Sequence, residues 1–246
     1  MNLRFALRAR KFRSKRDPAE IEWILEHTEP GGVAFDIGAH KGGWTYWMRK
    51  VVGPHGQVFA FEPQAELHAY LQRIFVSPRW QNVRVENVAL SSERGSGTLF
   101  IPDGRRSHSP AASLNCEIAA QENETREARV QVTTLDHYVR EQALSRVDLV
   151  KVDVEGWELN LLAGAQSTLK NQQANWIIES EARHIGKDRV LQLFDVMHDA
   201  GYAGFFFYSG DLRPLVEFSF EAHQSREGER FWDQPHYCNN FLFTKD

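Results

Sequence analysis

The segment Val33 to Gly43 (VAFDIGAHKGG) constrains the fold of this chain more than any other. A short apolar run ends at an acid and then at glycines, which is typical of a buried strand that stops in a tight loop. From Trp44 to Val52 the apolar residues recur at helical spacing. The segment therefore predicts a strand, a glycine loop and a helix. In an open parallel sheet such a loop lies at the carboxyl ends of the strands, where ligands bind.

The same alternation of strand and helix continues along the chain. A helix is predicted from Pro18 with Asp17 as its N-cap. Amphipathic helices separate the later apolar strands, and one of them is predicted over 159–169 from the apolar residues Leu159, Leu162, Ala163 and Leu169. This order predicts an α/β fold with a parallel, doubly wound sheet. The strands after the first are predicted at 57–62, 83–90, 147–154, 175–180, 203–208 and 240–244.

The alternation of strand and helix is interrupted between 91 and 134. Two segments there, 97–101 and 129–133, alternate like exposed strands, and the rest has the composition of loops. A connection of this length is more often functional than idle. Because no repeat or low-complexity linker is visible, we predict one domain over 31–246, preceded by a basic N-terminal arm and helix over 1–30.

The N-terminal segment has a charge opposite to that of the remaining chain. Residues 1–16 carry +7 and no acid, whereas the whole chain has a net charge of −4, which leaves −11 elsewhere. Interleaved apolar residues would allow peripheral contact with an anionic membrane. A solvated, partly frayed arm is the simpler expectation.

The apolar runs are too short to cross a bilayer, and the N-terminus has no apolar core of the signal-peptide type. A cytoplasmic location is the expectation. The two cysteines, Cys116 and Cys238, lie in unrelated contexts, so they predict neither a disulfide framework nor a cysteine metal site.

The glycine loop lacks the Gly-x-Gly-x-x-Gly dinucleotide fingerprint, since Asp36 precedes only the spaced Gly38 and Gly42. An acid at the strand end repels a pyrophosphate but suits an ammonium or sulfonium group. Glu62, at the end of the next strand, can accept hydrogen bonds from ribose hydroxyls. Ala39 and Pro63 border these two acids and are predicted to contact the same ligand.

Two residues near the end of the third strand extend this prediction to a base. Asn87 could hydrogen-bond an adenine edge, and Ala89 leaves room for the ring. A nucleoside that also bears a positively charged amino acid is S-adenosylmethionine, which we predict as the cofactor.

From about Val33 to Ala182 the sequence resembles the FkbM-type class I S-adenosylmethionine-dependent methyltransferases. The resemblance rests on FDIGAHKG, FAFEP, NVAL, the TLD of residues 134–136 and, most specifically, DLVKVDVEGWELNLLAGA. It implies a Rossmann-like, mostly parallel sheet of seven strands whose final strand is antiparallel, with an insertion after the third strand. It further implies O-methylation, often of a sugar or natural-product hydroxyl, and cofactor roles for the residues Asp36, Gly38, Gly42, Glu62 and Asn87.

A sulfonium donor leaves as a neutral thioether, so the enzyme mainly aligns the acceptor, and a general base helps with a hydroxyl. Four residues are predicted at the right edge of the sheet as candidates: Asp153, Glu155, Glu181 and His184. Asp153 would also lie near the cofactor. Alternatively, Asp153 could hold a divalent cation together with Glu179 or Glu181. The sequence leaves this choice, and the presence of a metal, open.

Two other classes of function are compatible with parts of the sequence. A nicotinamide-dependent oxidoreductase would share the sheet, but the missing glycine fingerprint argues against it. A non-catalytic scaffold could use the basic N-terminal arm to bind a membrane or an acidic polymer. For the methyltransferase, the expected partner is a small-molecule or glycan acceptor rather than a nucleic acid.

Overall fold

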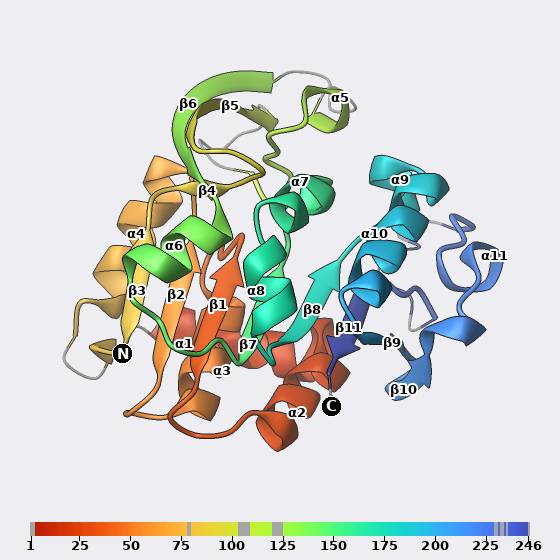
Figure 1. Ribbon diagram of the computed structural model, residues 1–246, viewed down its shortest axis with the longest axis horizontal. Coiled ribbons are helices and arrows are strands. Elements are labelled where there is room, and N and C mark those ends of the chain that lie inside the picture. Colours follow the sequence, from red (N-terminus) through yellow and green to blue (C-terminus); the bar gives the residue numbers. More distant parts are fainter. Residues whose placement is uncertain are drawn as a thin grey trace.

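The computed structural model describes residues 3–77, 80–102, 109–119, 125–228, 231, 234 and 236–245. Its centre is an eight-stranded sheet with the strand order β10-β9-β11-β8-β7-β1-β2-β3 (Figure 1). The strands are β1 (Val33–Ile37), β2 (Gln57–Phe61), β3 (Val83–Glu86), β7 (Leu149–Val152), β8 (Asn175–Glu179), β9 (Ala203–Tyr208), β10 (Asp211–Pro214) and β11 (Asn240–Thr244).

The sheet is parallel from β3 to β8, and β11 runs antiparallel to both of its neighbours, β8 and β9. The prediction of a mostly parallel sheet with an antiparallel final strand is therefore confirmed. The sequence reading missed one strand, since β10 pairs antiparallel with β9 and extends the expected seven strands to eight. All four residues of β10 are exposed, so the apolar pattern that marks a buried strand is absent there.

Helices cover both faces of the sheet. Those on the first face are α1 (Leu3–Lys11), α2 (Pro18–His27), α3 (Gly43–Val52) and α4 (Ala65–Phe75). Those on the second face are α6 (Leu135–Glu141), α7 (Glu158–Ala163), α8 (Gln166–Asn171) and α10 (Lys187–Asp199). Shorter helical segments are η1 (Phe12–Arg16), α5 (Cys116–Ala119), α9 (Ala182–Ile185), η3 (Leu215–Glu217) and α11 (Phe220–His223).

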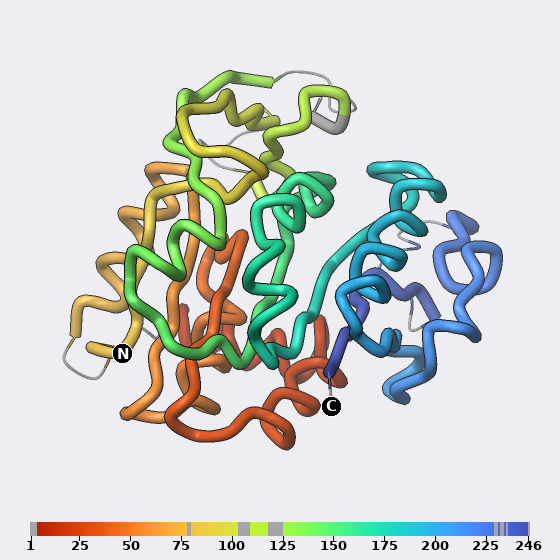
Figure 2. The backbone as a smooth tube through the Cα atoms, in the orientation of Figure 1, coloured from red at the N-terminus to blue at the C-terminus, as the bar shows by residue number. Residues whose placement is uncertain are grey.

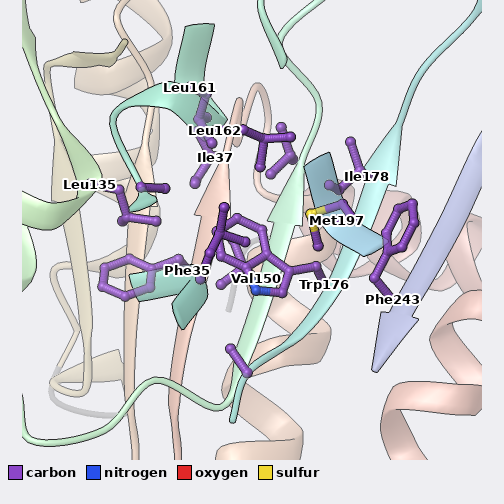
Figure 3. Close-up of a cluster of buried hydrophobic side chains, with 14 of the residues drawn as sticks. Phe35, Ile37, Leu135, Val150, Leu161, Leu162, Trp176, Ile178, Met197 and Phe243 are labelled. Atoms are coloured by element: carbon purple, nitrogen blue, oxygen red, sulfur yellow. The ribbon is translucent and has the colours of Figure 1, made fainter. Parts of the chain in front are cut away.

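The core is divided by the sheet because successive side chains of a strand point to opposite faces. Phe35 and Ile37 pack beneath the second set of helices together with Trp176 (Figure 3), whereas Ala34 belongs to the cluster under α1 to α4. All five residues of β1 are buried, as expected for a strand covered on both faces.

The insertion forms a separate small sheet. β5 (Gly95–Pro102) and β6 (Thr125–Thr133) pair antiparallel, which confirms the two strands predicted at 97–101 and 129–133. β4 (Ala89–Leu90) joins β6, so the strand predicted over 83–90 is in fact split between two sheets. The insertion lies beyond the carboxyl end of β1, at the top of Figures 1 and 2. The expected loop residues at 103–108 and 121–124 lie outside the described residues.

One local prediction is wrong, and another holds in position only. The helix expected over 159–169 breaks at Gly164, where a Cβ atom would lie 2.0 Å from the carbonyl oxygen of Ser91. Asp17 occupies the predicted N-cap position of α2, but its side chain does not cap the helix; its carboxylate accepts a hydrogen bond of 2.8 Å from Trp44 Nε1. In both cases a contact far along the chain replaces the local preference.

The N-terminal segment is packed against the sheet layer, so the expectation of a frayed arm is wrong for residues 3–16. The side chains of Phe5 and Ala9 are fully buried, and Trp47 Nε1 of α3 donates to the Ala9 carbonyl at 2.8 Å. No helix within the described part of the chain is both long and apolar enough to span a membrane.

Candidate functional site

A cavity of about 1520 Å³ opens at the carboxyl ends of β1, β2, β7 and β8. Its lining includes most of the residues that the sequence analysis singled out. Those residues are Asp36, Gly38, Ala39, Glu62, Pro63, Ala89, Asp153, Glu155, Glu179, Glu181 and His184. Parallel strands bring their carboxyl ends to one edge, which is why residues more than a hundred positions apart meet here.

Asp36 is a buried carboxylate at the next-to-last position of β1. Thr45 Oγ1, from the first turn of α3, donates a hydrogen bond to Asp36 Oδ2. Burial raises the pKa of Asp36 to about 6, although the Thr45 hydrogen bond and the nearby ammonium of Lys151 oppose the shift. The carboxylate thus faces the cavity with an incompletely compensated desolvation cost, which a cationic ligand would reduce.

Glu62 links the loops that follow β1 and β2. Its Oε2 accepts a hydrogen bond from the backbone N–H of His40 at 2.8 Å, and its Oε1 accepts one from Gln64 N–H at 2.9 Å. Burial raises the pKa of Glu62 to about 8 in spite of these two donors. Each carboxylate oxygen retains further acceptor capacity, so the group can still receive ribose hydroxyls.

Gly38 is required by a close approach of two backbones. Its φ is +87°, and a Cβ atom would lie 1.8 Å from the carbonyl oxygen of Asp153. The N–H groups of Gly38 and Ala39 both donate to the Phe61 carbonyl at 3.0 Å. These contacts hold the loop close to the ends of β2 and β7, and Gly38 adds no side chain to the cavity that it lines.

Two residues predicted at the cofactor do not line the cavity. Gly42 has a φ of +74°, and a Cβ atom there would lie 2.9 Å from Leu71 Cδ2. The turn before α3 and the packing of that helix therefore favour glycine at this position. The exposed Asn87 donates its amide to the carbonyls of Glu62 and Pro63, at 2.9 and 3.0 Å. Asn87 therefore holds the loop that carries Glu62.

On the acceptor side, Glu155 and His184 form a pair. Glu155 Oε2 lies 3.4 Å from His184 Nδ1, and Glu155 has a φ of +50°, a conformation that turns the chain sharply after β7. Burial, followed by the charges of Asp153 and Glu181, raises the pKa of Glu155 well above its ordinary value. Burial lowers the pKa of His184. The small sheet is tied to this pair, because Ser113 Oγ donates to the Glu155 carbonyl at 2.7 Å.

Glu181 is already engaged by its neighbours. Arg183 donates to both of its carboxylate oxygens, Nε to Oε2 and Nη2 to Oε1, each at 2.7 Å, and the Tyr237 hydroxyl also donates to Oε2. These bonds anchor the segment before β11 to the end of β8. Both carboxylate oxygens of Glu181 are therefore already bound by donors from the protein.

Sequence reasoning missed Lys151. This lysine interrupts the apolar strand β7 and is only 1% exposed; its Nζ donates to the Val152 carbonyl at 3.0 Å and lies 3.7 Å from Glu179 Oε2. Burial alone would lower the pKa of Lys151, but Asp153, Glu179 and other carboxylates raise it. A charged residue inside an otherwise apolar strand was the available signal.

The side chains described above do not form a ligand set for a divalent cation. Among residues whose placement is described, no group of three or more histidines, cysteines, aspartates or glutamates is arranged to hold a metal ion. Asp153 and Glu179, which the sequence suggested as ligands, instead interact with the buried ammonium of Lys151.

The sequence matches the family model of the FkbM methyltransferase domain over residues 36–203. The chain belongs to the FkbM methyltransferase family. The sequence is similar to "Methyltransferase 1" of Beauveria bassiana, with 30% identity over 142 residues that cover 52% of this chain and 56% of the relative. The resemblance inferred from the motifs is thereby confirmed.

Solved structures support the fold. The FkbM methyltransferase of Methylobacillus flagellatus KT superposes with a TM-score of 0.54 at 15% identity, covering 97% of this chain and 57% of the other. A Streptococcus mutans protein described as a methyltransferase, in complex with SAH, gives a TM-score of 0.50 at 9% identity and covers 93% and 97%. The fold is that of class I methyltransferases. This chain spans a little over half the length of the first two relatives.

Proposed function

We propose that this FkbM-family protein is an S-adenosylmethionine-dependent O-methyltransferase that acts on a hydroxyl of a sugar or natural-product-like acceptor. The observation that carries the proposal is the pair of Glu155 and His184, 3.4 Å apart, on the cavity that also contains Asp36 and Glu62. A proton acceptor and an acidic cofactor site thus share one space, as transfer of a methyl group to a hydroxyl requires.

The donor set of the cavity fits the cofactor. Glu62 is placed to accept the ribose hydroxyls, and Asp36 and Asp153 provide negative charge near the glycine loop for the ammonium and sulfonium groups. When bound, S-adenosylmethionine supplies an activated methyl group whose leaving group is a neutral thioether. The SAH complex of the Streptococcus mutans protein is consistent with this cofactor.

His184 is the better placed of the two partners to take the acceptor proton. Because burial lowers its pKa, the imidazole is neutral near pH 7 and can accept a proton. Glu155, once ionised, holds the Nδ1 side of the ring and stabilises the imidazolium that forms, so the Nε2 side is left for the acceptor. Trp157, which also lines the cavity, offers an apolar face for a sugar ring.

The two other classes of function have less support. A nicotinamide-dependent oxidoreductase would place a pyrophosphate over the glycine loop, where Asp36 and Glu62 would repel it. A non-catalytic scaffold would not need the acidic groups and the Glu155–His184 pair in one cavity. Membership of the FkbM family also favours methyl transfer.

Removing the base should reduce turnover and leave cofactor binding intact. We expect His184→Gln to lower the rate of methyl transfer from tritiated S-adenosylmethionine to a panel of sugars and other hydroxyl compounds by about 10²-fold or more. Wild-type turnover should rise with pH, because the raised pKa of Glu155 delays the ionisation that activates the pair. Glu155→Gln should abolish that rising limb of the pH profile.

The control measurement is the affinity for S-adenosylhomocysteine, measured by calorimetry on both variants. It should remain within about twofold of the wild-type affinity, since neither side chain is placed at the glycine loop. A loss of cofactor affinity as large as the loss of turnover, or an unchanged pH profile in Glu155→Gln, would contradict the assignment of this pair as the base.

A further inference from the structure

The N-terminal segment places positive charge directly on the cavity. Arg8 and Lys11 of α1, together with Lys15 and Arg16 of η1, belong to its lining; these four residues are called the basic wall below. All four side chains are exposed rather than buried in the fold. They recur at helical spacing, so they lie along one side of the segment.

The position of the basic wall is set by apolar packing. Phe5 and Ala9, on the opposite side of α1, are fully buried, and Trp47 Nε1 bonds to the Ala9 carbonyl. The ring of Phe12 lies against Gly43 at the start of α3, where a Cβ atom would come within 2.3 Å of it. The wall is therefore docked on the same loop that forms the cofactor site.

Two other basic residues of the segment, Arg10 and Arg13, do not line the cavity. Arg10 is exposed and does not line the cavity. Arg13 forms an ion pair with Glu22, with Nη2 and Oε2 at 2.8 Å, and lies over the ring of Trp47. Only one side of the segment thus presents its charge to the cavity, and Arg10 provides a matched comparison for Arg8.

The cavity lining carries charges of both signs. The carboxylates of Asp36 and Asp153 suit the cationic end of the cofactor, and Glu62 suits its ribose. From Arg8 to Arg16 the basic wall extends over about two helical turns. The cofactor has one carboxylate, which can engage only a small part of such a wall. The remaining positive charge suits an anionic group on the acceptor.

A membrane surface fits the basic wall less well. The apolar side chains that would enter a bilayer, Phe5, Ala6 and Ala9, are buried against the protein, and among residues 4–16 only Leu7 is a large exposed apolar side chain, at 55%. An interfacial helix needs a free apolar face to bind lipid.

We propose that the basic wall is a subsite for a phosphate or diphosphate group on the acceptor, so that the hydroxyl compound methylated by this protein is phosphorylated. The inference rests on the proposed function for the identity of the reaction. Guanidinium groups bind phosphate oxygens through paired hydrogen bonds, and lysines add unoriented charge. The bound phosphate would anchor the acceptor at the wall while its hydroxyl extends toward Glu155 and His184.

The test is calorimetric titration of inorganic pyrophosphate into protein saturated with S-adenosylhomocysteine. Wild-type protein should bind pyrophosphate, with an affinity that decreases as salt is added. The double variant Arg8→Gln and Lys11→Gln should bind it about tenfold or more weakly, because two charge-assisted contacts are lost. Arg10→Gln should stay within about twofold of wild type, because an exposed charge outside the cavity contributes little.

Four outcomes would overturn the proposal. The first is absence of pyrophosphate binding to wild type. The second is a loss in Arg10→Gln equal to that in the double variant. The third is a loss of S-adenosylhomocysteine affinity in the double variant with pyrophosphate binding unchanged, which would assign the wall to the cofactor carboxylate. The fourth is a loss, in the double variant, of binding to phosphatidylcholine vesicles containing about 30% phosphatidylserine with pyrophosphate binding unchanged, which would assign the wall to a membrane.

A variant that keeps the charge separates binding from folding. Arg8→Lys combined with Lys11→Arg should restore pyrophosphate binding, and the melting temperature of every variant should match that of wild type, since these side chains are exposed. The titration requires no turnover. Failure of the proposed O-methylation would appear as absent methyl transfer to all hydroxyl compounds, whereas failure of this inference would appear as unphosphorylated acceptors being used equally well.

Discussion

At the scale of single residues, the site is defined by buried charge. Asp36 and Glu62 are almost completely buried, and burial raises the pKa of each, to about 6 and about 8. Lys151 adds one buried ammonium to this acidic site. Buried carboxylates that lack full compensation favour a ligand of positive charge, because its binding returns part of the lost solvation. This imbalance supports the proposed sulfonium cofactor.

Glu62→Ala should weaken binding of S-adenosylmethionine by about 1–3 kcal/mol, through loss of charge-assisted hydrogen bonds to the ribose. Because the pKa of Glu62 is raised to about 8, wild-type affinity should increase as pH rises toward 9 and the carboxylate ionises. Calorimetry across this pH range measures both effects.

The exposed Glu66→Ala, four positions along the chain and outside the cavity, is the control for Glu62→Ala and should bind the cofactor normally. A pH-independent wild-type affinity, or equal affinities of the two variants, would remove Glu62 from the ribose site. Micromolar binding of NAD in place of S-adenosylmethionine would overturn the cofactor assignment itself.

At the scale of elements, the docking of α1 and η1 on α3 organises the mouth of the cavity. Gly42 and Gly43 begin α3 without side chains, which lets Phe5 and Phe12 approach its first turn. Gly42 and Gly43 are thus explained by the packing of other helices against α3. Gly38 is needed because the loop passes close to the backbone at the end of β7. One short motif meets two separate structural needs.

Phe5→Ala should destabilise the protein by about 3–5 kcal/mol, the usual cost of removing a fully buried phenylalanine ring. The ring packs edge-on against Tyr46, Phe75 and Trp80, so its loss leaves a cavity between α1, α3 and α4. Urea denaturation measures the free energy of unfolding. Leu7→Ala, which truncates a half-exposed side chain of the same helix, should change that free energy by less than about 0.5 kcal/mol. Equal stability of the two variants would show that α1 does not pack as described.

At the scale of the whole molecule, opposite charges from distant parts of the chain converge. The basic N-terminal segment and the acidic strand ends of a net negative body meet at one cavity. The early helix α2 and the final strand β11 are also joined, because Asn240 Nδ2 of β11 donates to Glu20 Oε1 of α2 at 3.3 Å. Glu20 is buried, and burial together with Asp17 raises its pKa to about 8.

Glu20→Gln should stabilise the protein at alkaline pH. A carboxyl group whose pKa is higher in the folded than in the unfolded state makes stability fall as pH rises between the two values, here from about 4.5 to about 8. Glutamine keeps an acceptor for Asn240 and carries no charge to desolvate. The melting temperature of the variant at pH 9 should exceed that of wild type by about 2–4 °C per kcal/mol relieved, with little difference at pH 5. A constant difference across this range would contradict the role of Glu20 ionisation.

The sequence by itself determined the order of strands and helices and the meeting of Asp36 with Glu62. Strand and helix patterns are local, and a parallel sheet brings the carboxyl ends of its strands to one edge, so these residues needed no further information. The insertion was visible for the same reason, as a break in the pattern. The family motifs could also be recognised from the sequence, because each is a contiguous segment.

Only the tertiary structure decided which side chains touch. It paired Glu155 with His184, engaged Glu181 with Arg183, buried Lys151 among carboxylates, and turned the basic segment toward the cavity. It also placed Asn87 and Gly42 outside the cavity lining, where they support the loop and α3. Each of these outcomes depends on packing and burial between segments far apart in the chain, and burial and long-range contact are the quantities that local sequence patterns do not encode.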